Sequence, residues 1–488
     1  MSMKRRTFLI GSVTGVSLFA VAACTPDTPT PTPTVPVVPS KVPQPIAFHR
    51  TNWTADPFSY GAFSYQAVDS DPRDRATLSE PVDDRLFFAG EAVSQEEPGT
   101  VYGARDSGLR AAIAVAEVAE PGERIAVVGA GIAGASAARR LSDEGFNVVV
   151  VEGRERAGGR IHSFDDGEWP FPVELGAAIV QTPGATIAAE LEMLGVELVP
   201  APVRQEVRTR TGVQIENTTT ASQAVADAIA WAAEQSRDSS VAEALRDSGA
   251  GDLDASPGEG GVSDALRLTH FLQADISAQR AADPDDLSAW FTSLPDVQED
   301  PDGQEDGADE ADTDRKLVIG GYQSLVEDAL HDVDVLPSST VTSVTTTERG
   351  VSLRLARGDS LSADRVIVTV PLGVLKAGSI EFTPALPFSH RGAIDALGVG
   401  RQEKLLLRFA KPFWSSTATR WDVMDASTDF PLWVNLLPIT GEPMLVAVFG
   451  GDTADRLSES SDAELLEAAL SSLEPFIDPD LVESEPTD

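Results

Sequence analysis

The stretch that decides the fold is "ERIAVVGAGIAGASAARRLSDEGFNVVVVEGRERAGGRIHS", residues 123–163. An apolar run at 125–128 predicts a buried β-strand. A glycine-rich turn follows, and residues 133–141 have the pattern of a helix. A second apolar run at 148–151 predicts another strand, which ends at Glu152. Strand, turn, helix and strand in this order are typical of a βαβ unit in a parallel sheet.

The glycines of the turn have the G-x-G-x-x-G spacing of a dinucleotide-binding site. Gly129 allows the tight turn, and Gly131 lets the backbone approach a pyrophosphate. Gly134 lets the helix pack closely on the strand, and the helix N-terminus faces the phosphates. The Glu152 carboxylate is placed to accept hydrogen bonds from a ribose diol. These residues predict a dinucleotide site, but they do not choose between NAD and FAD.

The segment after the second strand carries a family resemblance. The run "VVGAGIAG…VVVVEGRERAGGRIHS…VELGAAIV", within residues 127–180, resembles the flavin-containing amine oxidases. That family includes monoamine oxidases, polyamine oxidases and the flavin-dependent histone lysine demethylases. The resemblance implies FAD as the cofactor. It also implies that Arg160 lies against the FAD diphosphate and that "LGA" at 175–177 runs beside the flavin.

Three later segments resemble the polyamine oxidase and demethylase branch in order and spacing. They are "GGYQSLVEDAL" from Gly320, residues 339–387, and "AIDALGVGRQEKLLLRFAKPFW" at 393–414. The resemblance implies that the backbone of Val341 meets the adenine ring. It also implies that Lys404 holds a water against flavin N5. Taken without this motif, Lys404 would be interpreted as an ordinary lysine at the end of a strand.

The segment that ends an amine oxidase chain comes first in this one. Residues 51–118, "TNWTADPFSYGAFSYQ…LFFAGEAVSQEEPGTVYGARDSGLRAAIAVAEV", resemble it, and residue 488 falls where that segment would begin. This order predicts a circular permutation joined by the turn "AEPGE" at 119–123; a misjoined fragment of a neighbouring protein is the alternative. The resemblance then places Gly90 and Glu91 at the ribityl and phosphate region of FAD. It places the backbone around Thr100 and Val101, with the dipole of the following helix, at the flavin pyrimidine ring.

The turn and the resemblance together define the expected FAD contacts. They are Gly90, Glu91, Thr100, Val101, Gly129, Gly131, Ile132, Ala133, Gly134, Glu152, Gly159, Arg160, Gly176, Ala177 and Val341.

Composition limits the classes of partner. The 488 residues carry a formal net charge of -40, so nucleic acid is an unfavourable partner because phosphate is repelled. A cationic substrate would be attracted, although solubility alone also explains such a surface. Much of the acid lies at 298–314, which predicts a solvated insertion. One cysteine and five scattered histidines give no intrachain disulfide, no cysteine-based zinc site and no closely spaced histidine metal ligands.

The first residues have the layout of an export signal. A basic start with Arg5-Arg6 precedes an apolar run at 8–23 and resembles a twin-arginine signal. "VAAC" at 21–24 resembles a bacterial lipobox, so Cys24 is the expected lipidation site. The Pro/Thr-rich residues after it predict an extended stalk. The sequence thus predicts a lipoprotein outside the cytoplasm, held to the membrane only by its N-terminal lipid; a generic signal with a chance cysteine is the alternative.

The substrate side departs from the family pattern. Relatives place an aromatic cage residue before the final helix, where this chain has Glu97 and Thr100. Glu97 is a candidate for attracting a cationic amine or a plain loop acid. Trp433 is a candidate pocket residue or a buried aromatic of a sheet. The "AIVQT" after "LGA" also differs from the common "W-I-H-G".

The expected fold is α/β: a Rossmann-like FAD-binding lobe and a mixed α+β substrate lobe. Expected boundaries are 1–24 signal, 25–45 stalk, 46–118 permuted FAD-lobe segment, 119–200 βαβ unit, 201–316 helical part of the substrate lobe with the acidic insertion, 317–377 adenine side of the FAD lobe, and 378–488 substrate-lobe sheet.

The resemblance implies a flavin-dependent oxidase of small primary or secondary amines. A hydride passes to flavin N5, O2 is reduced to H2O2, and the imine hydrolyses. Monoamine oxidases of that family hold FAD through a cysteine. Since the sole cysteine here lies in the signal, FAD is expected to be non-covalent, or at least not bound through sulfur. The alternatives are an amino-acid or other oxidase on the same scaffold, and a non-catalytic surface lipoprotein that keeps FAD.

Overall fold

The computed structural model describes residues 40–181, 185–292 and 315–482 of the chain. The export signal, Cys24, most of the stalk and the acidic insertion at 298–314 lie outside these ranges. None of the described helices combines the length and apolarity that a membrane span requires.

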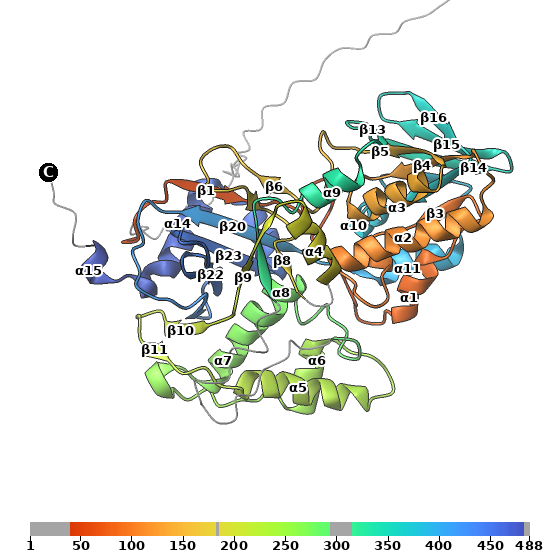
Figure 1. Ribbon diagram of the computed structural model, residues 1–488. Helices are drawn as coiled ribbons and strands as arrows, with labels where there is room; N and C mark the ends of the chain where they lie inside the picture. Colours follow the sequence, from red (N-terminus) through yellow and green to blue (C-terminus); the bar gives the residue numbers. More distant parts are fainter. Residues whose placement is uncertain (1–39, 182–184, 293–314, 483–488) are drawn as a thin grey trace, which may run out of the picture. The chain divides into compact units, whose positions relative to one another are not determined.

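A five-stranded parallel sheet forms around the glycine-rich turn (Figure 1). Its strands, from edge to edge, are β13 (Asp334–Leu336), β5 (Asn147–Val151), β4 (Arg124–Val128), β17 (Arg365–Val368) and β3 (Leu86–Phe88). The edge strand β3 precedes the other four in the chain, yet it pairs with β17, which comes last. The segment at 51–118 is therefore part of this sheet.

Alternation along β4 explains the layers on both faces of the sheet. Ile125 and Val127 pack against helices α2 (Val101–Val118) and α3 (Ile132–Asp143), which lie side by side in Figure 1. Ala126 and Val128 pack on the opposite face, against β14 (Val341–Thr347), β15 (Gly350–Leu355) and α11 (Phe388–Ala396). Covering on both faces is what an apolar parallel sheet requires.

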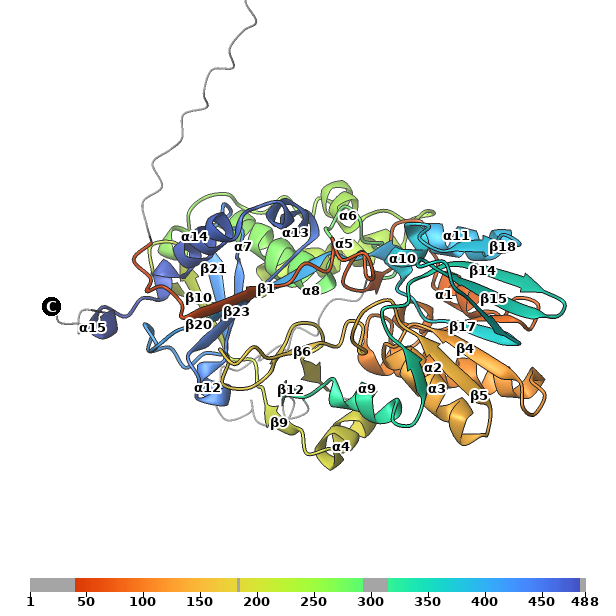
Figure 2. The same ribbon diagram turned by 90° about the horizontal axis from the view of Figure 1, so that it is seen from above.

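A second, mostly antiparallel sheet has seven strands. Their order is β1 (Ala47–Arg50), β20 (Gln402–Arg408), β23 (Met444–Gly450), β22 (Leu432–Asn435), β21 (Arg420–Met424), β10 (Gln205–Thr209) and β11 (Gln214–Ile215). One face packs against α13 (Gly451–Ser458) and α14 (Asp462–Leu473) through buried aromatic residues. Figure 2 shows these helices on one side of the sheet and β9 (Glu197–Pro200) and β12 (Lys316–Ile319) on the other.

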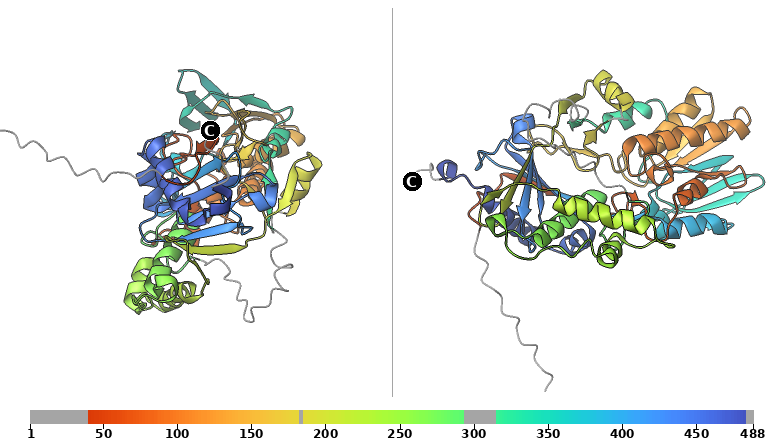
Figure 3. Two further views of the ribbon diagram at one scale, coloured as in Figure 1. Left: turned by 90° about the vertical axis from the view of Figure 1, so that its left-hand side faces the viewer. Right: turned by 90° about the horizontal axis from the view of Figure 1, so that it is seen from below.

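A helical group lies beside this sheet (Figure 3). It contains α5 (Thr220–Ala233), α6 (Val241–Ser248), α7 (Asp264–Phe271), a π-helix η3 (Leu272–Ser277) and α8 (Ala278–Arg280). An alanine-rich core holds the group together. Residues 249–263 connect α6 and α7.

The remaining elements are short. They are β2 (Ser64–Tyr65), α1 (Pro72–Ser79), η1 (Glu91–Val93), β6 (Ser163–Phe164), β7 (Val173–Glu174), β8 (Ile179–Val180), α4 (Ala185–Met193), β9 (Glu197–Pro200), η2 (Glu259–Gly261), β12 (Lys316–Ile319), α9 (Ser324–Ala329), β16 (Ser360–Ala363), α10 (Leu372–Lys376), β18 (Glu381–Thr383), β19 (Gly398–Val399), α12 (Leu437–Thr440), η4 (Glu474–Phe476) and α15 (Pro479–Val482).

Strand pairing moves three of the expected boundaries. Strand β1 pairs with β20, so the chain from residue 46 begins in the seven-stranded sheet. Strands β10 and β11 also belong to that sheet, so the region at 201–316 is not purely helical. Strand β18 pairs with β14, and α11 packs on the parallel sheet, so the first lobe extends beyond residue 377.

Two junctions bring distant parts of the chain together. Arg365 on β17 donates to the carbonyl of Val118 at 2.6 Å and to the carboxylate of Glu123 at 2.6 Å. It therefore holds the end of α2 beside the start of β4. At the other junction, Ser40 Oγ donates to the carbonyl of Leu470 at 3.1 Å, and the Lys41 amide donates to Glu474 at 3.2 Å.

Candidate active site

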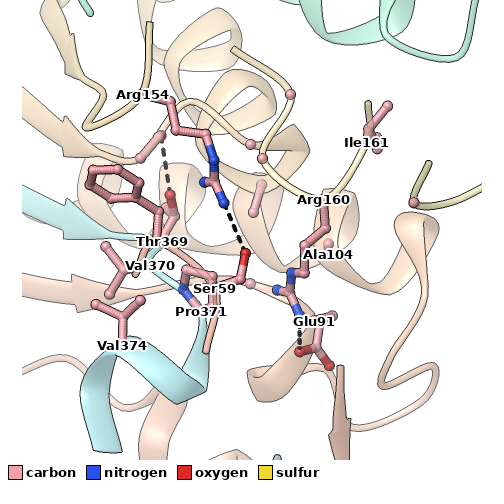
Figure 4. A pocket seen from close by; sticks show the side chains of 18 of the residues that line it. Ser59, Glu91, Ala104, Arg154, Arg160, Ile161, Thr369, Val370, Pro371 and Val374 are labelled. Atoms are coloured by element: carbon pink, nitrogen blue, oxygen red, sulfur yellow. Dashed lines mark hydrogen bonds and ion pairs between the residues drawn. The ribbon is translucent and has the colours of Figure 1, made fainter. Parts of the chain in front are cut away.

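A cavity of about 470 Å³ opens at the carboxyl ends of the parallel strands, beside the glycine-rich turn. In an open α/β sheet this edge is where ligands bind. Figure 4 shows side chains from several segments converging on it, with Arg154 toward Ser59 and Arg160 toward Glu91. The walls come from residues 53–63, 90–104, 128–133, 151–161, 175–177, 339–341 and 369–380, with Gln402 and Lys404 at one end.

The turn has the backbone geometry that its glycines allow. Gly129 has φ +109°, a conformation that favours glycine, and an added Cβ would lie 2.6 Å from Thr369 Oγ1. A Cβ on Gly134 would lie 2.0 Å from the Gly129 carbonyl oxygen. Gly131 precedes α3 without a side-chain cap, so the first N–H groups of the helix lack that partner. These N–H groups and the helix dipole favour an anion in the cavity.

Glu152 lies at the end of β5, as the sequence predicts. Its carboxylate accepts from the amides of Ala130 at 2.7 Å and Arg154 at 2.8 Å. The Arg154 guanidinium donates to Asp56 at 2.6 Å and to Ser59 at 2.9 Å. The loop from residues 51–118 is thus tied directly to the βαβ unit at the cavity wall.

An ion pair between Arg160 and Glu91 crosses the cavity from two distant segments, with a separation of 3.0 Å. The Glu91 carboxylate also accepts from Ser64 Oγ at 2.6 Å and the Gly99 amide at 2.9 Å. Burial alone would raise the pKa of Glu91, but Arg160, Ser64 and Arg75 outweigh it and lower this pKa. Glu91 is therefore a stable anion that orients Arg160.

The N-terminus of α2 forms another part of the wall. Thr100 caps the helix by accepting from the Gly103 amide at 3.0 Å, and Thr100, Val101 and Ala104 line the cavity. Since α2 has 18 residues, its dipole adds positive potential at this end.

A second cavity, of about 350 Å³, lies between the seven-stranded sheet and the small sheet of β8, β12 and β9. Gln402 and Lys404 line both cavities. They are two residues apart on β20, so both side chains project from the same face. The two cavities therefore meet at these two side chains.

Lys404 is positioned by backbone groups. Its Nζ donates to the carbonyl oxygens of Gly176 at 2.5 Å and Glu174 at 3.4 Å. Burial lowers the pKa of Lys404 to about 8, although the nearby Glu174 acts in the opposite direction. The ammonium therefore gains and loses its proton near neutral pH, where a charge change can affect chemistry.

The structure brings together nearly all the side chains predicted at the cofactor. Of the fifteen expected FAD contacts, fourteen line the first cavity, and the exception, Gly134, packs behind the turn. Lys404 lies at the junction of the cavities.

Both substrate-side candidates lie away from the cavities. Trp433 is fully buried on the α14 side of the sheet and donates to Ser472 Oγ at 3.0 Å, so it is a buried sheet aromatic. Its neighbours Leu432 and Val434 line the second cavity instead. Glu97 lines neither cavity, and its carboxylate accepts from the Tyr102 hydroxyl at 3.4 Å.

Sequence reasoning did not identify Arg154, Thr369 and Gln402. Arg154 follows Glu152 by two residues, a spacing that could have indicated the same wall. Thr369 follows an apolar strand at its carboxyl end, where ligand-binding residues of α/β sheets gather. Gln402 precedes Lys404 by two residues, so strand alternation could have placed both on one face.

Comparison with known proteins agrees with this arrangement. A sequence model of the family described as flavin containing amine oxidoreductase matches residues 33–116 and 132–487. Polyamine oxidase 2 of Arabidopsis thaliana is 28% identical over 363 residues, which are 69% of this chain and 69% of that protein. Polyamine oxidase 4 of Oryza sativa subsp. japonica is 28% identical over 380 residues, which are 74% of each chain.

Solved structures show the same fold. Cyclohexylamine oxidase from Brevibacterium oxydans has a TM-score of 0.55 and 20% identity, covering 75% of this chain and 84% of that one. Putrescine oxidase bound to putrescine has a TM-score of 0.54 and 22% identity, covering 75% and 83%. With the family model matching on both sides of the 119–123 turn, this chain belongs to the family of flavin containing amine oxidoreductases.

Proposed function

We propose that this protein is an FAD-dependent oxidase of small primary or secondary amines. The observation that carries the proposal is the junction of the two cavities at Lys404 and Gln402. One cavity has the features of a dinucleotide site, and the other is a separate chamber that opens onto its end. The overall reaction is amine plus O2 and H2O, giving an aldehyde, an amine or ammonia, and H2O2.

The first cavity leaves room for FAD at two glycines of its lining. A Cβ on Gly90 would meet no protein atom within 4 Å, and one on Gly131 would meet only the Gly158 carbonyl at 4.0 Å. Both glycines line the cavity, so their missing side chains leave open space for a ligand. The α3 N-terminus and Arg160 would hold the diphosphate, Glu152 the ribose, and the α2 N-terminus the flavin end.

Bound FAD would supply the acceptor for the hydride that leaves the α C–H bond of the amine, with O2 as the final acceptor of the two electrons. The chain's own residues position a water and the amine at the junction of the two cavities. The Lys404 ammonium, fixed on two carbonyl oxygens, is placed to hold a water at the junction and to supply a positive charge there. Neutral amine would enter from the second cavity. No general base is required by this arrangement.

FAD is proposed to bind without a covalent bond. The described lining of the first cavity contains neither cysteine nor histidine. Acid precipitation of the purified protein tests this point, since non-covalent flavin stays in the supernatant and covalent flavin precipitates with the chain.

The order of the segments is proposed to be a circular permutation of the family chain. Strand β3 and helix α2 occupy the edge of the sheet beside β17 and α3, although they precede both in sequence. The 119–123 turn joins α2 to β4, and residues 40–41 contact residues 470–474. These junctions are the ones that a permutation would require.

Twin-arginine export and lipidation at Cys24 are proposed from sequence alone. Fractionation and mass spectrometry of the native protein test them. A diacylated Cys24 at the N-terminus of membrane-bound protein is expected; a soluble chain that retains residues 1–23 would contradict both.

The test of function uses the folded chain from residue 25 onward. Its visible spectrum is recorded before and after anaerobic addition of monoamines, diamines and polyamines. A yellow protein that bleaches with an amine and releases H2O2 when air is admitted is expected. A yellow protein that no amine bleaches would contradict the amine oxidase activity, and a colourless folded protein would contradict the flavin site.

A further inference from the structure

The second cavity has an apolar floor made by one face of the seven-stranded sheet. Leu406, Val446 and Val434 lie opposite one another on the adjacent strands β20, β23 and β22. Val448 lies beside them, opposite Lys404. The floor therefore starts at the junction with the first cavity and continues across the sheet as a strip of aliphatic side chains.

The strip ends at a guanidinium. Arg420 on β21 lies opposite Val434, so the row from Leu406 to Arg420 crosses three strand spacings, or ~14 Å. Ile179 and Leu317 of the small sheet line the cavity from the other side. A long apolar chain thus fits between the junction and Arg420.

Arg420 is held by two carboxylates that do not line the cavity. It donates to Asp422 at 2.9 and 2.8 Å and to Asp275 at 2.7 and 3.1 Å. These four bonds use four of the five N–H donors of the guanidinium. Arg420 is therefore unable to grip a substrate carboxylate with two parallel hydrogen bonds. Its charge is balanced by these carboxylates, so Arg420 presents N–H donors rather than a hydrogen-bond acceptor to the far end of the strip.

At the far end of the strip, the described lining of this cavity has no carboxylate for a second ammonium. Its one acidic residue, Glu174, lies near Lys404 at the other end, and its carboxylate accepts from Ser163 Oγ at 2.8 Å and from the amides of Gly321 at 3.1 Å and Tyr322 at 3.0 Å. A diamine lying along the strip would lose the hydration of its distal ammonium and meet Arg420 instead. Burial of an unpaired ammonium is strongly unfavourable.

We propose that the second cavity selects monoamines with an apolar body and rejects diamines and polyamines. This inference rests on the proposed amine oxidase function and names the substrate class of that site. It separates this chain from relatives named polyamine or putrescine oxidase, whose substrates carry more than one amine. The distal end of the substrate, rather than the reacting nitrogen, decides the selection.

The test compares n-hexylamine with 1,6-diaminohexane, which have the same chain length and differ at the distal end. Anaerobic flavin reduction by each amine is followed by stopped flow on the flavin-loaded protein at pH 8. We expect the apparent second-order rate constant for the diamine to be about 100-fold lower. The difference between the rate constants of the two amines should decrease near pH 10, where the distal amine of the diamine begins to lose its charge.

A cavity variant provides a second measurement. Val446→Asp places a carboxylate on the strip, and Val446→Asn is the control of the same shape without charge. We expect Val446→Asp to raise the diamine-to-monoamine ratio about 10-fold over Val446→Asn. Equal ratios in the two variants would count against the inference. If Val446→Asp fails to hold flavin, the comparison of hexylamine with diaminohexane on the unmodified chain still decides.

The outcomes separate the two proposals. A diamine that reduces the flavin as fast as hexylamine, or faster, overturns the selection of monoamines and leaves the amine oxidase activity intact. A protein whose flavin is reduced by neither these amines nor any other member of the amine panel overturns the proposed function itself.

Discussion

Lys404 is the residue whose charge is expected to control the reaction with O2. Its Nζ lies at the junction of the cavities, and burial lowers its pKa to about 8. The lysine is cationic below this pH and neutral above it. A fixed positive charge favours the arrival of negative charge on O2, and the loss of one such group costs about 100-fold in rate. The Lys404→Met variant should therefore reoxidise about 100-fold more slowly, while keeping its FAD.

The pH profile distinguishes this role from a structural one. In the unmodified protein, kcat/KM for O2 should fall as the pH rises through about 8, because the cationic form of Lys404 is lost. The profile of Lys404→Met should be flat in this range, and Lys404→Arg should keep a high rate to higher pH. A fall near pH 8 that persists in Lys404→Met would assign the titration to another group.

At the scale of elements, the crossing of α2 and α3 depends on a glycine. An added Cβ at Gly108 would lie 2.1 Å from the Ala133 carbonyl oxygen, so the helices touch backbone to backbone. Ala133 lines the first cavity, and displacement of α3 would move the diphosphate site. We expect Gly108→Val to lower the free energy of unfolding by about 3 kcal/mol and to weaken FAD binding.

Thermal unfolding and flavin content of the purified protein measure both effects. Glu117→Val, on the exposed side of the same helix, is the control and should change stability by less than about 0.5 kcal/mol. Equal behaviour of the two variants would mean that the helix crossing tolerates side-chain volume and that close packing is not needed there.

The elements also show what sequence could predict. The βαβ unit was predictable because its glycines, its apolar runs and Glu152 each have one structural task at a set spacing. The face of β22 was not predictable, because Leu432, Trp433 and Val434 are all apolar and give no alternation. A shift of one residue exchanges the two faces of a strand, and this is why Trp433 was a candidate while Val434 lines the cavity. The extension of the first lobe beyond residue 377 was not predictable, because it depends on the pairing of β18 with β14, a contact between distant segments.

At the scale of the whole molecule, the proposed permutation predicts that the chain can be returned to the family order. In the rearranged chain, residues 123–488 come first and residues 40–118 follow, so that Glu123 still pairs with the buried Arg365. The contacts of Ser40 and Lys41 with residues 470–474 place the new joint between neighbouring segments. The cut removes residues 119–122, and Arg365 still holds both flanks of this turn through Val118 and Glu123. Chain breaks in such exposed connections are well tolerated.

We expect the rearranged chain to bind FAD, with a free energy of unfolding within about 2 kcal/mol of the natural order. The matched control opens the chain between Ala126 and Val127, inside the buried strand β4, and should bind no flavin because the central strand of the parallel sheet is broken. Flavin content and denaturant unfolding are measured for the rearranged chain and for the control. A rearranged chain that binds no more FAD than the control opened in β4 would show that the order of the segments is itself needed for folding. The flavin lobe would then depend on residues 40–118 being made first, and a simple rotation of the family chain would not describe this protein.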